Sequence, residues 1–449
     1  MVELDLTEDE LVAKNYMLKL WNLGGVEHCD TGKVSDIESI LPPWYDAEKF
    51  KRGQKYFNEN RFGMMNGCLF GLIALLCDPR GTRLLMHTEK SSTPKTAKKR
   101  YISTSLHMLY WYELDLTPGS KSWQSLNRIR KMHLNASNSA TKHNIGFISQ
   151  AELAMTTFGF LGFALLRPQF LGIEYGNRED REAFIHLWAV VDYMLGVRDE
   201  FNMCLFKLEI VEIICKIMLR YVFIPLLQFE TVEFKIMVNA FLKGMSEFTP
   251  LNTYGTTMFL ARRMAGIPGY QLDVDLKEEN TLFKPIFTLE ELLNLRDTYL
   301  SKPGYEYLRV IFLDDNVYLF DLEKCDECEE ATEENIRRNS VTGIYRQLQT
   351  DVNGNNVKSD KTEEVLNILR KLMDAKSDEE IKVRKINDTN EWKSLLNDSN
   401  FSKLSFRDRL NTRLILRVIK NNQYSTGKSL NNCISKNIVY RMKKYMKSD

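Results

Sequence analysis

The sequence predicts an all-α protein, a single large helical bundle with a polar, partly helical C-terminal extension. Apolar residues recur near a 3.6-residue spacing through most of the first 230 positions. Proline and glycine are few, 11 and 23 in 449 residues, and they gather in short breaker sequences between the periodic segments. Hydrophobic residues make up 44% and charged residues 27%, which excludes a disordered, collagenous or polytopic membrane chain.

The periodic segments predict helices, in chain order, over 46–60, 98–112, 120–136, 147–166, 178–196 and 198–227. Ser120 precedes its segment as an N-cap, and Thr288 stands in capping-box spacing with Glu291. Two uncharged runs, 62–77 and 153–166, fall short of the roughly 20 residues that a membrane span needs. We therefore expect them to be buried helices.

Composition divides the chain into four parts. Residues 1–40 form a helical lead-in, 41–322 the main helical domain, 323–400 an acidic and polar linker, and 401–449 basic amphipathic helices. Near the end of the main domain, two apolar runs within 307–322 flank an Asp-Asp-Asn sequence, which suits either a β-hairpin or a helix.

The net charge of +1 hides an asymmetry, because residues 401–449 carry +10 and the first 400 residues carry −9. The basic helix expected at 406–420 can pack on the protein's own acidic surface, touch anionic lipid or bind nucleic acid. Packing on its own protein is the commonest case. No aromatic-interleaved basic sheet accompanies the charge, so we expect no nucleic-acid partner.

Eight cysteines in 449 residues are too sparse for a disulfide framework. Cys68, Cys77 and Cys215 lie in apolar runs and are predicted to be buried free thiols. The CxxC sequence of Cys325 and Cys328 has no second ligand pair nearby. A zinc or redox site there is therefore less expected than two thiols in an acidic loop.

Two helical spacings bring chemical groups together. Arg130 and His133 stand at i and i+3 and share one helix face. A neutral imidazole can bind a metal or a haem iron, and a guanidinium can pair with a carboxylate such as a haem propionate. Arg100 and Thr104 share a face at i and i+4. The alternatives are a packed helical histidine and a solvated helix start.

A third cluster, 184–202, contains His186, Trp188, Asp192 and Gly196. Histidine and large aromatics on such a segment usually belong to a packed core. The chain has six histidines and no HExxH, GxSxG, P-loop or GxGxxG sequence, so zinc hydrolysis, acyl transfer and nucleotide-phosphate binding lack their usual motifs.

Five segments in order resemble one family: LPPWYDAEKFKRGQKYF, KSSTPKTAKKRYIST, SLNRIRKMHLNAS, FISQAELAMTTFGF and FIHLWAVVDYMLGVRDEFN. They are similar to the catalytic domain shared by MpaB, the endoplasmic-reticulum-bound oxygenase of mycophenolic acid biosynthesis, and the rubber oxygenases called latex clearing proteins. The resemblance covers about residues 41–270. It implies an all-helical domain that binds one haem b and adds dioxygen across a C=C bond of an apolar isoprenoid- or lipid-like substrate, cleaving it to carbonyl products.

The resemblance also implies residue roles. His133 matches the proximal haem-iron ligand, Arg130 the arginine one turn before it, and Arg100 with Thr104 the catalytic pair on the distal side. His186 and Trp188, with Gly196, match a motif close to the haem pocket. Arg262 or Arg263 matches a propionate partner, and Arg263 is our choice. Gln150, Glu152 and Thr156 match a further helical motif, with Glu in place of Asp.

Two departures limit these expectations. Ser103 stands where certain rubber oxygenases have a distal lysine ligand, so that ligand and polyisoprene as the substrate are not carried over. The C-terminal extension lies outside the resemblance, and it favours an alternative function, an inactive helical scaffold that interacts through its basic tail. The acidic N-terminus has no secretory signal pattern. We therefore expect a cytoplasmic protein, or one that contacts the endoplasmic reticulum or another membrane peripherally.

Overall fold

The computed structural model describes residues 4–267 apart from 175 and 229, residues 270, 286–288, 291 and 294, and residues 399–421 and 425–448. All regular elements of these residues are helical, and their one β-type pairing is an isolated bridge between His28 and Ser149. The predicted all-α fold is confirmed. The predictions for residues 307–322, for the CxxC sequence and for the linker as far as residue 398 lie outside the described residues.

The main helices are α1 Glu8–Lys19, α2 Ala47–Glu59, α3 Arg61–Leu76, α4 Pro79–His87, α5 Pro94–Glu113, α6 Lys121–Lys142, α7 Gln150–Leu166, α8 Pro168–Leu171, α9 Arg178–Leu195, α10 Leu208–Met218, α11 Ile224–Gln228, α12 Val232–Met245, α13 Tyr254–Ala265, α20 Ser399–Ser402, α21 Phe406–Asn421 and α22 Ser425–Ser448. Short π and 3-10 turns join some of them: η1 Leu20–Gly24, η2 Val34–Asp36, η3 Asp199–Phe201, η4 Met203–Leu205 and η5 Leu219–Phe223.

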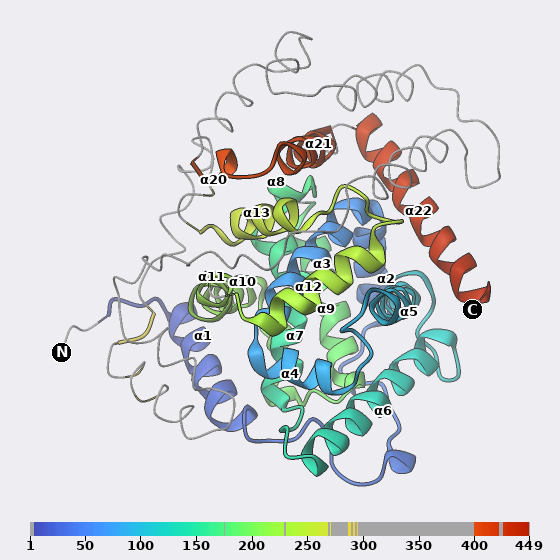
Figure 1. The fold of residues 1–449 in the computed structure, drawn as a ribbon. Helices are drawn as coiled ribbons and strands as arrows, with labels where there is room; N and C mark the ends of the chain where they lie inside the picture. Colours follow the sequence, from blue (N-terminus) through green and yellow to red (C-terminus); the bar gives the residue numbers. More distant parts are fainter. Residues whose placement is uncertain are drawn as a thin grey trace.

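Helices α3 and α7 cross at the centre of the molecule (Figure 1). Both are apolar on nearly all sides, and α3 buries Phe70, Ile73 and Leu76. They approach so closely that a Cβ atom on Gly71 would lie 1.9 Å from the carbonyl oxygen of Gly159. The predicted buried helices at 62–77 and 153–166 are therefore confirmed as the core of the bundle.

Side-chain caps explain where several helices begin. Ser120 accepts a hydrogen bond from Trp123 N–H at the start of α6, as predicted. Thr288 and Glu291 form the predicted capping box, with N···O distances of 2.8 and 3.2 Å. Helix α7 begins at Gln150, three residues later than predicted, because Ser149 caps it.

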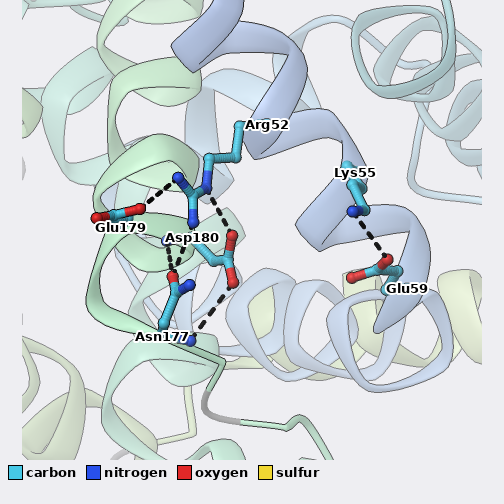
Figure 2. A network of polar contacts seen from close by, with 6 residues as sticks. All are labelled: Arg52, Lys55, Glu59, Asn177, Glu179 and Asp180. Carbon is cyan, nitrogen blue, oxygen red and sulfur yellow. Dashed lines mark hydrogen bonds and ion pairs between the residues drawn. The ribbon is translucent and has the colours of Figure 1, made fainter.

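Helices α2 and α9 pack along each other, and one arginine ties α2 to the N-terminal end of α9 (Figure 2). Arg52 donates to Asp180 Oδ1 at 2.7 Å, to Glu179 Oε2 at 2.5 Å and to Asn177 Oδ1 at 3.1 Å. Asn177 is also the N-cap of α9. The two carboxylates suit this position because a helix N-terminus attracts negative charge.

The single helix predicted over 198–227 is wrong. Two 3-10 turns occupy residues 199–205, α10 begins at Leu208, and a π turn separates it from α11. Asn202 provides the reason for the first break. Its Nδ2 donates to Ala189 O at 2.8 Å while its Oδ1 accepts from Cys204 N–H at 3.1 Å, which holds the backbone out of a continuous helix.

Both ends of the chain pack on the central helices. At the N-terminal end, α1 lies along α10. At the C-terminal end, α21 lies on α13, and α22 lies against α3 and α5 along one side of the molecule (Figure 1). The described part of the basic extension is therefore a layer of the same bundle.

No single helix among the described residues is long and apolar enough to cross a membrane. Helices α3 and α4 pass that test only as a pair, bent by 91° at their junction. The core position of α3 gives its apolar composition another explanation, since its apolar side chains pack inside the bundle.

Candidate functional site

Helices α5 and α6 form an antiparallel pair that carries most of the predicted site. Ser122 Oγ donates to Tyr110 O at 2.7 Å, and His107 Nδ1 lies 2.7 Å from Ser125 Oγ. These contacts set the register of the pair. Because the two helices are antiparallel, residues nearer the N-terminal end of α5 face residues nearer the C-terminal end of α6. Extended by about three turns, the register brings Arg100 opposite His133. The charge of Arg100 is close enough to act on the His133 ring.

His133 is held as a neutral imidazole. Its side chain is half-buried, its Nδ1 atom is fully buried, and neither ring nitrogen has a hydrogen-bond partner among the described residues. Burial and then the positive charge of Arg100 lower its pKa to about 4, although Asp30 acts in the opposite direction. The neutral form is the one that binds a metal ion.

Arg100 is a half-buried guanidinium that no carboxylate of the described residues neutralises. Its hydrogen bond to Thr88 Oγ1 is long, at 3.4 Å, and burial lowers its pKa. Thr104, one turn further along α5, is exposed. The pair therefore offers a fixed positive charge and a free hydroxyl on one helix face.

Arg130 has a different environment from the one expected of a propionate partner. Its Nε and Nη2 atoms donate to both oxygens of Asp30, at 2.8 and 2.7 Å. The guanidinium is thus neutralised within the protein, and its pKa is raised by these hydrogen bonds. Asp30 was missed by sequence reasoning, because it lies 100 residues away and before the region of resemblance.

Two further predicted residues, His186 and Trp188, lie on α9. His186 Nε2 accepts a hydrogen bond of 3.2 Å from Asp46 N–H at the start of α2, and burial lowers the pKa of its ring. Trp188 is buried against Phe160 (ring centroids 4.6 Å) and near Trp111. Trp188 occupies the packed core that the alternative interpretation expected, whereas His186 is half-buried beside the start of α2.

Arg263 lies on α13, with its guanidinium 5.1 Å from the centre of the Phe170 ring. Its neighbour Arg262 forms an ion pair with Glu230. Helices α13 and α6 lie at opposite ends of the molecule in Figure 1. The structure does not bring Arg263 to His133.

The chemistry of His133 and Arg100 suits a b-type haem. Such a haem needs one axial ligand, a cation for a propionate and apolar surroundings. His133 supplies an uncommitted neutral imidazole and Arg100 an uncompensated charge, and Met132, which precedes His133 in the sequence, is an apolar side chain that is 45% exposed. Within the described part of the chain, no three His, Cys, Asp or Glu side chains gather to hold a bare metal ion.

Comparison with known proteins shows a similarity in sequence. The chain is 26% identical to a rubber oxygenase of Streptomyces sp. (strain K30) over 221 residues, which cover 43% of this chain and 50% of that protein. It is similar to a rubber oxygenase. The resemblance expected from the sequence motifs is thus confirmed, while the chain spans about half the length of the relative it matches.

No family model matches the chain. Among solved structures, the latex clearing protein in its closed state aligns with 68% of this chain and 88% of its own, at 18% identity and a TM-score of 0.40.

Proposed function

We propose that the protein is a haem b-dependent oxygenase that adds dioxygen to a C=C bond of an apolar isoprenoid- or lipid-like substrate and cleaves it. The observation that carries the proposal is the neutral, uncommitted imidazole of His133 facing the uncompensated guanidinium of Arg100. The sequence similarity to a rubber oxygenase supports the reaction class.

Each residue has a distinct role in this proposal. His133 binds the iron through a ring that burial keeps unprotonated. Arg100 holds an anionic group, such as a propionate, through charge-assisted hydrogen bonds. The exposed hydroxyl of Thr104 donates or accepts a hydrogen bond on the same side as Arg100, and Met132 offers apolar contact to a hydrocarbon chain.

A bound haem supplies the iron at which dioxygen reacts. The overall reaction balances without another reductant. The C=C bond breaks, two C=O bonds form, and each product takes one oxygen atom of the same dioxygen molecule.

The test begins with the absorption spectrum of the protein loaded with haem. We expect a Soret band that His133→Ala abolishes and that His143→Ala leaves unchanged. His143 is the matched control because it is exposed at the end of the same helix, where its Nδ1 atom bonds Ser139 O at 2.8 Å. A colourless wild-type protein after haem loading would contradict the proposal.

Turnover is tested by oxygen uptake and by product mass after reaction in ¹⁸O₂ with a panel of unsaturated isoprenoids and lipids. One ¹⁸O atom in each carbonyl product is expected. Normal haem loading without oxygen uptake across the panel would favour the inactive scaffold instead.

A further inference from the structure

We propose that Asp30 is a positioning residue for His133, because it anchors through Arg130 the turn of α6 from which the imidazole projects. The inference rests on the proposed role of His133 as the haem ligand. It adds to the site a residue that precedes the whole region of resemblance, so the lead-in segment becomes part of the haem-binding machinery.

The contact between Asp30 and Arg130 is bidentate. Both carboxylate oxygens accept a hydrogen bond, from Nε at 2.8 Å and from Nη2 at 2.7 Å, and the side chains are 10% and 19% exposed. Two parallel hydrogen bonds between a planar guanidinium and a carboxylate fix the orientation of the two groups as well as their distance. Arg130 lies one turn before His133 on the same face of α6, so the anchor acts next to the ligand.

Asp30 is itself held by its backbone neighbours. Cys29 N–H donates to Ile148 O at 2.8 Å, and Gln150 Nε2 donates to Cys29 O at 2.9 Å. The same Nε2 atom donates to Gly196 O at 2.9 Å. The carboxylate is therefore positioned by the start of α7 and the end of α9 before any cofactor binds.

Gly196 leaves the space that the ion pair needs. Its φ of 101° is in the left-handed region, which favours glycine. A Cβ atom there would lie 2.8 Å from Asp30 Oδ2 and 3.1 Å from Arg130 Nε. Three distant parts of the sequence thus meet around one carboxylate.

The two arginines near the His133 imidazole therefore have different roles. Asp30 neutralises Arg130 and is close enough to act on the His133 ring, whereas Arg100 on α5 stays uncompensated. An anionic cofactor group is therefore directed to Arg100, and Arg130 serves the protein's own structure.

The experiment measures haem binding to the full chain by absorbance titration. Groups that hydrogen-bond a metal-ligating histidine typically contribute 10–100-fold to metal affinity. Asp30 acts through Arg130 and not on the ring directly, so we expect the low end of that range, about tenfold weaker haem binding in Asp30→Asn. The matched control is Asp36→Asn, an exposed carboxylate on the same segment that accepts from Ser35 Oγ at 2.8 Å. It should bind haem like the wild type.

A second readout separates positioning from general stability. The iron–histidine stretching frequency of the reduced protein, measured by resonance Raman spectroscopy, should shift in Asp30→Asn. Asp30→Glu, which keeps the charge but lengthens the arm, should shift it less, and this variant also serves if Asp30→Asn does not fold. In an Arg130→Gln background, Asp30→Asn should add no further loss of haem affinity.

The outcomes distinguish this inference from the proposed function. A wild-type protein without a Soret band overturns the proposed function and this inference with it. A Soret band that depends on His133, combined with unchanged affinity and stretching frequency in both Asp30 variants, overturns the inference alone. Full additivity of the Asp30 and Arg130 effects would also overturn it, because Asp30 would then act independently of Arg130.

Discussion

The two arginines near His133 differ in one respect that decides their energetic roles. Arg130 has a bidentate carboxylate partner, whereas Arg100 has only a long hydrogen bond to a threonine. Burying a charged group without a counter-charge lowers the free energy of unfolding. A charged group that keeps a hydrogen-bonded counter-charge lowers it less. In the proposed function, Arg100 is therefore the residue at which haem binding is gained at the expense of stability.

Arg100→Met tests this trade. Methionine keeps an unbranched apolar stem while the charge is removed, so we expect the haem-free protein to gain about 1 kcal/mol in free energy of unfolding. Haem affinity should fall in the same variant. Urea unfolding and haem titration measure the two effects, with Arg83→Met, at an exposed position of α4, as the control. A haem-free Arg100→Met protein less stable than the wild type would refute the idea.

Asp192 is a buried carboxyl group on α9, in the core. Thr157 Oγ1 donates to its carboxylate at 2.8 Å, and burial raises its pKa well above the usual 3.8. The folded protein therefore holds this proton at pH values where the unfolded chain has released it. By linkage, its contribution to stability falls as the pH rises from about 4 towards the raised pKa, by about 1.4 kcal/mol per pH unit.

Asp192→Asn should remove that slope, because asparagine has nearly the same shape and no proton to lose. We expect the variant to exceed the wild type in stability at pH 8 and to match it near pH 4. Urea unfolding at pH 4, 6 and 8 measures the difference. A constant difference at all three pH values would contradict the assigned proton.

At the scale of elements, the features predicted correctly were those that depend on residues close together in the sequence. Periodicity located the helices, and Ser120 and Thr288 were recognised as caps because a cap and its target are three residues apart. The break at Asn202 was missed because its side chain reaches a carbonyl on another helix. Asp30 was missed for the same reason, since its partner lies 100 residues away.

The candidate site was predictable only in part. The spacing of Arg130 and His133 marked α6, but which arginine stays uncompensated depends on the fold. Arg263 illustrates the difference. Its sequence position suggested a propionate partner, and the fold places it against Phe170 on α8.

The crossing of α3 and α7 gives a prediction at this scale. Gly71→Ala would place a methyl group 1.9 Å from a backbone oxygen that cannot move away cheaply. We expect a loss of about 3 kcal/mol in free energy of unfolding. Gly81→Ala in α4 is the control, since the nearest atom would be Asp78 Oδ2 at 3.6 Å, and it should gain about 0.5–1 kcal/mol. Thermal and urea unfolding measure both, and equal effects would contradict the crossing.

For the whole molecule, the main question is whether the basic extension is an appendage or a part of the bundle. Residues 401–449 carry a net charge of +10 and the first 400 residues carry −9, and specific contacts join the described parts of the two. Arg441 Nη2 lies 3.3 Å from Glu247 Oε1, Lys443 Nζ lies 3.7 Å from Glu113 Oε2, and Asp408 bonds Thr253, the N-cap of α13. The described part of the extension thus neutralises and covers acidic positions of the body.

Phe401 tests this integration, because it is fully buried against Phe259 of α13, with ring centroids 5.4 Å apart. Phe401→Ala leaves a cavity in a shared core, so the main unfolding transition should lose about 3 kcal/mol. The loss should appear in one cooperative transition, followed by calorimetry and by near-ultraviolet circular dichroism. Tyr440→Ala, at a position 54% exposed on α22, should change little. An unchanged main transition, or a separate early one, would show that the extension unfolds on its own and that the bundle does not depend on it.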